Sequence, residues 1–136
     1  MANTGPKWSA WTVLQNAVVL TQGGTIVATS DAVSLDMKAG CEYSVVATYS
    51  DDAKATAGLS VSILRDVDGT NYQVAADLPQ GVEMVFTQNA ARSFVDSICG
   101  MLVGSFKLYL AWGNTTAGSV VTVTTRYRTC DVPVAS

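Results

Sequence analysis

The last third of the chain shows the clearest alternation of hydrophobic and polar positions. In residues 106–112 every second residue is large and apolar, and residues 120–128 set valines against threonines and arginines. Side chains of a strand alternate between two faces, so each run predicts a strand with one buried face. Gly113, Asn114 and Gly118 lie between the runs and are typical turn residues. We therefore predict that the two runs form a β-hairpin at the centre of the core.

Other runs with the same alternation cover much of the remaining chain. They are residues 33–37, 41–49 and 59–63. Residues 38–40 are the expected turn after the first of these runs. Gly23-Gly24 lies between two short apolar runs and Asp68-Gly69 between two alternating ones, and both pairs indicate hairpins.

No segment keeps a 3.6-residue period, which an amphipathic helix would need. Short strands with regularly spaced turn signals are typical of antiparallel sandwiches and jelly rolls. The expected fold is therefore an all-β, antiparallel, jelly-roll-like β-sandwich with short turns. We expect an N-terminal arm at 1–12, the sandwich domain at 13–130 and a C-terminal tail at 131–136.

Composition limits the possible partners. Of the 136 residues 49% are hydrophobic and 14% are charged, and the formal net charge is -3. The eight lysines and arginines are scattered, whereas a phosphate backbone needs clustered cations, so we expect no nucleic-acid partner. No apolar run is long enough to cross a bilayer, and residues 1–7 lack the apolar core of a signal peptide. We expect no membrane partner and synthesis in a cytoplasm.

Residues for catalysis or metal binding do not form any familiar pattern. The chain has no histidine, which excludes Ser-His-Asp and Cys-His catalysis and histidine-bound metals. Asp66, Asp68 and Asn71 resemble part of a calcium loop but lack its further acidic positions, so a hairpin turn is the preferred interpretation. Cys41, Cys99 and Cys130 have no metal-ligand spacing and are interpreted as reduced thiols. We predict no enzyme activity, catalytic residue, cofactor or metal.

Aromatic residues are the better candidates for binding. Trp8 and Trp11 precede Leu14, and the preferred interpretation places the tryptophans in a first strand that anchors the core. Alternatively, Trp8, Trp11 and Leu14 form a partner interface, because tryptophan is enriched at interface hot spots. Tyrosines on polar faces could form a sugar platform or a subunit contact instead of packing under loops. These are Tyr43, Tyr72 and Tyr109.

The order of these elements resembles the virion β-sandwich proteins of tailed bacteriophages. The resemblance rests on residues 59–72, which end in Asp-Gly-Thr-Asn-Tyr, followed by the apolar strand 106–112, Gly113-Asn114 and the Val/Thr strand 120–127. Small capsid decoration (cement) proteins and tail-appendage modules share this order, and it spans about two-thirds of the chain.

The resemblance implies a structural role on the capsid exterior of a virion. The chain would bridge copies of the major capsid protein and stabilise the shell as a homo-oligomer, expected to be a trimer. The alternative is a carbohydrate-binding or tail-appendage β-sandwich module.

Overall fold

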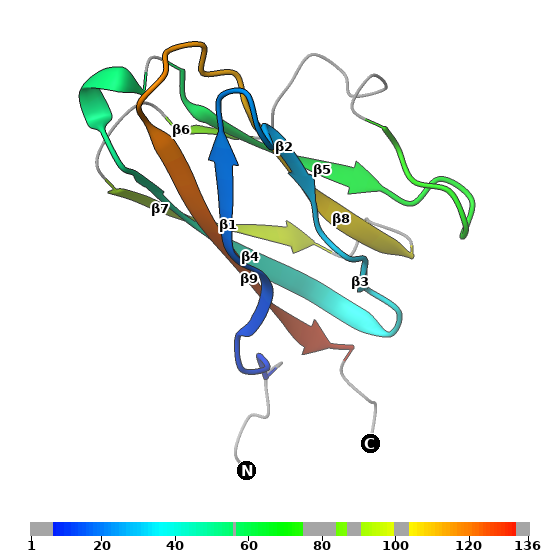
Figure 1. Ribbon diagram of the computed structural model, residues 1–136. Helices are drawn as coiled ribbons and strands as arrows, with labels where there is room; N and C mark the ends of the chain where they lie inside the picture. Colours follow the sequence, from blue (N-terminus) through cyan, green and yellow to red (C-terminus); the bar gives the residue numbers. More distant parts are fainter. Residues whose placement is uncertain (1–6, 56, 75–83, 87–90, 100–103, 133–136) are drawn as a thin grey trace.

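The computed structural model describes residues 7–55, 57–74, 84–86, 91–99 and 104–132 (Figure 1). In this part of the chain the secondary structure is almost entirely β, apart from one short 3₁₀ turn, η1 (Asp52–Lys54). The strands form two antiparallel sheets that pack face to face. The prediction of an all-β sandwich is confirmed.

Sheet A is four-stranded in the described residues. Its order is β1 (Thr12–Thr21), β9 (Val120–Asp131), β4 (Lys38–Tyr49) and β7 (Ala91–Cys99). Sheet B has the order β2 (Val27–Thr29), β8 (Ser105–Trp112), β5 (Leu59–Arg65) and β6 (Met84–Phe86), and β3 (Val33–Ser34) also pairs with β8. Strands β9 and β8 each pair with a strand on both sides, so they lie inside their sheets.

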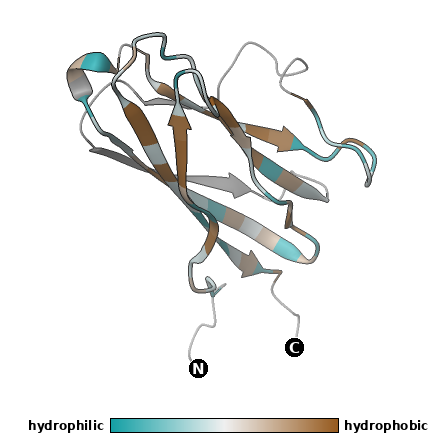
Figure 2. Cartoon of the chain, viewed as in Figure 1, coloured by the Kyte–Doolittle hydropathy of each residue, from teal (hydrophilic) through white to brown (hydrophobic). Residues whose placement is uncertain are grey.

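Alternating apolar residues from the two sheets make one core. The predicted inner face of β8 is fully enclosed, and so is the face of β4 that packs against the core. Their buried side chains are Phe106, Leu108, Leu110 and Trp112 from β8, and Cys41, Tyr43, Val45, Ala47 and Tyr49 from β4. Figure 2 shows hydrophobic residues along both sheets and hydrophilic residues in the loop after β5. Burial of apolar area on this scale is the main stabilising term of the fold.

The predicted central hairpin is wrong in its pairing, although both of its strands exist. β8 pairs with β2, β3 and β5, whereas β9 pairs with β1 and β4. Residues 113–119 therefore carry the chain from one sheet to the other (Figure 1). The apolar faces of β8 and β9 meet across the core, and alternation alone does not distinguish this arrangement from pairing side by side.

The Gly23-Gly24 hairpin is also wrong. A turn forms there, with Gly23 at a φ of 75° and the Thr21 amide donating to the Thr25 carbonyl at 2.8 Å. The strands on either side nevertheless enter different sheets, β1 in sheet A and β2 in sheet B. Glycine provides the turn, but the partners of the flanking strands are set by the core.

The turn predicted at residues 38–40 lies earlier than expected. Lys38 donates its amide to the Leu35 carbonyl at 3.0 Å, and Met37 has a φ of 60° and is 75% exposed. Residues 38–40 already belong to β4. Val33 and Leu35 are buried as the alternation predicts, but Met37 occupies the turn and does not reach the core.

Strand β1 is an irregular edge of sheet A. Its register against β9 shifts twice between Val13 and Val18, and Ala17 adopts a φ of 48°. Within this stretch the Thr125 hydroxyl donates to Gln15 Oε1 at 2.9 Å, and both side chains are buried. Bulges of this kind twist an edge strand and discourage pairing with another sheet.

Candidate binding surfaces

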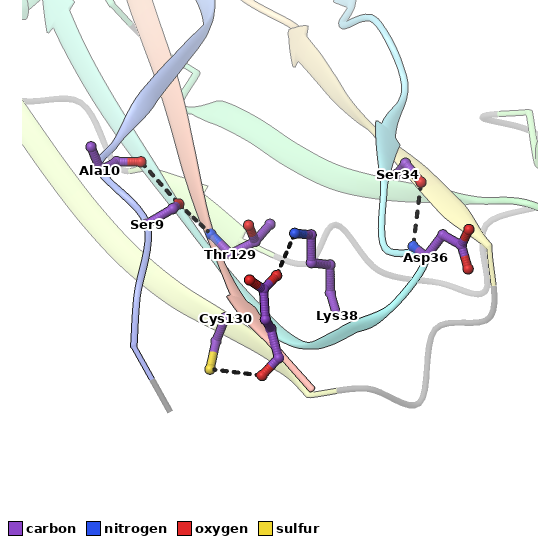
Figure 3. A network of polar contacts seen from close by, with 8 residues as sticks. Ser9, Ala10, Ser34, Asp36, Lys38, Thr129 and Cys130 are labelled. Carbon is purple, nitrogen blue, oxygen red and sulfur yellow. Dashed lines mark hydrogen bonds and ion pairs between the residues drawn. The ribbon is translucent and has the colours of Figure 1, made fainter. Parts of the chain in front are cut away.

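The segment before β1 lies along the end of β9. Trp8 forms an isolated bridge with Cys130, and the Ser9 amide donates to the Thr129 carbonyl at 2.8 Å. The Thr129 amide donates in return to the Ser9 hydroxyl at 3.0 Å (Figure 3). Near the same end, Lys38 Nζ lies 2.5 Å from a carboxylate oxygen of Asp131. The bridge of Trp8 and the two bonds between Ser9 and Thr129 hold residues 8–9 against sheet A within the same chain.

The two tryptophans of this segment are not in the core. Trp8 is 40% exposed and Trp11 is 38% exposed, so the preferred interpretation of both as core anchors is wrong. Leu14 is half-buried and packs against the core cluster, away from the solvent that the indoles face. The structure therefore separates Leu14 from the exposed pair, and their joint role in a partner interface stays a prediction.

Arg128 brings the two indoles together. Its guanidinium carbon lies 5.1 Å from the centre of the Trp8 ring and 4.7 Å from that of Trp11. Glu42 on β4 binds the same guanidinium, accepting from Nε at 2.7 Å and lying 2.5 Å from Nη2. The charge of Arg128 is thus balanced, and the planar group holds both rings by cation–π contact.

Exposed valines extend this surface. Val13 lies opposite Arg126 and Val46 opposite Thr124 in the strand registers, so both share the outer side of sheet A. Val13 is 48% exposed and Val46 is 37% exposed. We call this surface, consisting of Trp8, Trp11, Val13, Glu42, Val46 and Arg128, the Trp–Arg face. Sequence reasoning missed Glu42 and Arg128, because only the β4–β9 register places them opposite each other.

A groove of about 460 Å³ lies over the outer side of sheet B. Leu64 of β5 and Tyr109 and Lys107 of β8 form its base, and Thr29 of β2 lies directly opposite Tyr109. Residues 70–74, which include the last residues of the hairpin turn after β5, form the remaining wall. Leu64 is only 5% exposed although it faces away from the core.

Lys107 and Tyr72 contact each other inside this groove. Lys107 Nζ lies 4.4 Å from the centre of the Tyr72 ring, and the Tyr72 hydroxyl hydrogen-bonds to the Ser105 hydroxyl. Of the three tyrosines proposed as a platform, Tyr72 and Tyr109 therefore lie in one groove. Tyr43 is fully buried, and its part in any platform is wrong.

The acidic loop beside the groove is a hairpin turn. The Asp68 carboxylate accepts from the amides of Thr70 at 3.0 Å and Asn71 at 2.7 Å, and Asp66 accepts from Gly69 at 2.6 Å. The bonds from Asn71 and Thr70 hold the pKa of Asp68 below its ordinary value. The carboxylates thus stabilise the loop itself, and no group of three or more metal-ligating side chains occurs among the described residues.

The cysteines have no activating environment in the described part of the chain. Burial, and next the charge of Glu42, raise the pKa of Cys41 to about 11. Cys130 is also buried and free, whereas the side chain of Cys99 lies outside the described residues. A thiol with a raised pKa is a weak nucleophile, so Cys41 serves packing.

No known protein family model matches the chain, and no curated protein matches it. Among the residues that the structure describes, no helix has the length and apolar character needed to span a membrane.

Proposed function

We propose that the chain is a structural virion protein that decorates a phage capsid and stabilises it by bridging copies of the major capsid protein. One observation carries this proposal: the Trp–Arg face presents two exposed indoles that are already fixed by Arg128. Tryptophan and arginine dominate the energetics of protein interfaces. Fixing them before contact lowers the entropy lost on association.

The order of the strands supports the jelly-roll part of the proposal. β2 and β3 both pair with β8, so they count as two pieces of one strand position. In the described residues each sheet then has four strand positions, as in an eight-stranded jelly roll, a fold that occurs in viral capsid proteins. This fold similarity is an analogy and does not by itself assign a function.

In this proposal the chain acts by attachment through the Trp–Arg face and has no enzymatic role. Many symmetric copies would each add a modest apolar contact, and the total resistance of the shell would grow with the number of copies. A homotrimer on the capsid exterior, made in the host cytoplasm, is the proposed state. Light scattering at high protein concentration should show a trimer, and a clean monomer would contradict this part.

The decisive experiment uses purified virions of the phage that encodes the chain. Mass spectrometry should find the chain in intact particles, and recombinant protein should rebind to particles from which it has been stripped. Trp8→Ala with Trp11→Ala should weaken rebinding at least about tenfold, because indoles are typical hot spots. The matched control is Ile26→Ala with Val67→Ala, which removes two exposed apolar side chains outside the face.

A folded double variant that rebinds normally would rule out the Trp–Arg face as the attachment surface. Absence of the chain from the particles would overturn the virion role itself. The carbohydrate-binding alternative uses a different surface, the groove over sheet B, and is compatible with attachment through sheet A.

A further inference from the structure

We propose that the groove over sheet B binds an acidic saccharide, with Lys107 contacting a sugar carboxylate and Tyr109 packing against the ring. The groove is on the opposite sheet from the Trp–Arg face, so this site does not depend on capsid attachment. It adds a ligand and its chemical class to a protein otherwise described by its structural role.

The volume of the groove is sufficient for a single sugar ring. Its volume of about 460 Å³ lies within the roughly 300–1,000 Å³ of small-molecule sites. Leu64 and Tyr109 project from neighbouring strands of one sheet, so the base is rigid and does not depend on a loop. A site built on strands keeps its geometry better than one built on loops alone.

The polar lining matches the hydroxyl groups of a sugar. Thr29 and Thr70 contribute hydroxyls to the lining. Asn71 Nδ2 already donates to Asp68 Oδ2 at 2.7 Å, and Gln73 Oε1 accepts from the Arg65 amide at 3.1 Å, so Asn71 Oδ1 and Gln73 Nε2 are the side-chain amide atoms that remain for a sugar. Hydroxyl and amide groups both donate and accept hydrogen bonds, as sugar hydroxyls do. An aromatic ring offers a flat apolar face to the C–H side of a pyranose, and its hydroxyl remains available for a polar contact.

Charge decides for an acidic sugar over a neutral one. Among the described residues that line the groove, Lys107 is the only charged one, and it makes no ion pair with any other described residue. The nearby carboxylates of Asp66 and Asp68 accept hydrogen bonds from amides of their own loop, and neither forms an ion pair with Lys107. Contact with the Tyr72 ring keeps the ammonium group at the groove without neutralising it.

A single lysine fits a singly charged carboxylate better than a phosphate chain. Phosphate sites are typically built from several cations, arginine forks or helix N-termini, and the described part of the groove lining includes none of these. The net charge of -3 would also repel a polyanion at long range. A uronic acid combines one carboxylate with a ring of hydroxyls, which is the set of groups that the lining complements.

The test follows backbone amide shifts of the ¹⁵N-labelled full chain by NMR during titration with D-glucuronate, D-glucose and acetate. Glucuronate should shift the amides of Leu64, Tyr72, Lys107 and Tyr109, glucose should do so more weakly, and acetate should not. Absence of groove shifts with glucuronate would overturn the proposal. Equal groove shifts with acetate would also overturn it, because the ring would then contribute nothing.

Variants test the two assigned roles separately. Lys107→Met should weaken glucuronate binding about tenfold and leave glucose binding unchanged, since a charged hydrogen bond is lost. Tyr109→Ala should weaken the binding of both sugars. Tyr109→Leu tests the same loss of the aromatic ring if the first variant does not fold. Arg126→Ala, on the outer side of sheet A, is the matched control and should bind like the wild type. Unchanged glucuronate binding by folded Lys107→Met would refute the role of the charge.

Discussion

The Trp–Arg face and the groove use similar groups in different electrostatic states. On sheet A, Arg128 lies between two indoles and its charge is balanced by Glu42 at 2.7 Å. On sheet B, Lys107 lies over Tyr72 and has no acidic partner among the described residues. A balanced cation makes a fixed, largely apolar surface suited to a protein. An unbalanced cation in a groove retains its attraction for an anion.

The largest expected effect is on the reactivity of Cys41, which is buried in sheet A beneath the Trp–Arg face. Because the pKa of Cys41 is raised from 9.0 to about 11, its thiolate fraction at pH 8 should be about a hundredfold below that of an ordinary cysteine. Reaction with a disulfide reagent should therefore be slow in the native protein and fast in urea. Mass spectrometry of the modified peptides would identify the residue, and rapid native modification of Cys41 would contradict its buried state.

Loss of the Glu42 charge beside Arg128 should destabilise the protein more than loss of the Lys107 charge in the groove. Glu42→Gln leaves the partly buried Arg128 without its counter-ion and should lower the free energy of unfolding by about 1–3 kcal/mol. Lys107→Met keeps the aliphatic stem and removes an unpaired charge, so its effect should stay within about 0.5 kcal/mol. Urea unfolding measures both. Equal losses would remove the distinction between the surfaces.

The planar shape of Arg128 should also contribute. Arg128→Lys keeps the charge but loses the flat stacking on both indoles, and we expect a loss of about 1 kcal/mol. Tryptophan fluorescence should change at the same time, because the environment of Trp8 and Trp11 changes. Arg126→Lys, its neighbour on the same side of β9, makes a suitable control and should change neither quantity.

The smallest effect concerns the loop beside the groove. The pKa of Asp68 is lowered from its ordinary value of 3.8 when folded, so the unfolded state binds its proton more readily. The stabilisation from ionised Asp68 is therefore present above that value and lost as the pH falls below it. At pH 7 the melting temperature of Asp68→Ala should be slightly below that of the wild type. The difference should shrink below pH 3.8, and a constant difference would argue against this cause.

The sequence was sufficient for strands and faces but not for the binding surfaces. Tyr109 could be named as a candidate because it occupies a polar position in an alternating run, and Tyr72 because it follows the Asp-Gly turn signal. Arg128 and Glu42 are separated by 86 residues, and no local pattern indicates that they pair. The two tryptophans were expected in the core because tryptophan is so often a core residue. Their exposure follows from a segment that runs along β9, where the Arg128 side chain supplies a partner outside the core.

Alternation of apolar and polar residues by itself determined that this chain forms strands and which side of β4, β5 and β8 is buried. The physical reason is local, since successive side chains of a strand point to opposite faces and the apolar ones leave water. Only the tertiary structure decided that β8 and β9 belong to different sheets and that Arg128 meets Glu42. Backbone hydrogen bonds are alike for every strand, so the choice of partner depends on how the whole set of faces packs into one core.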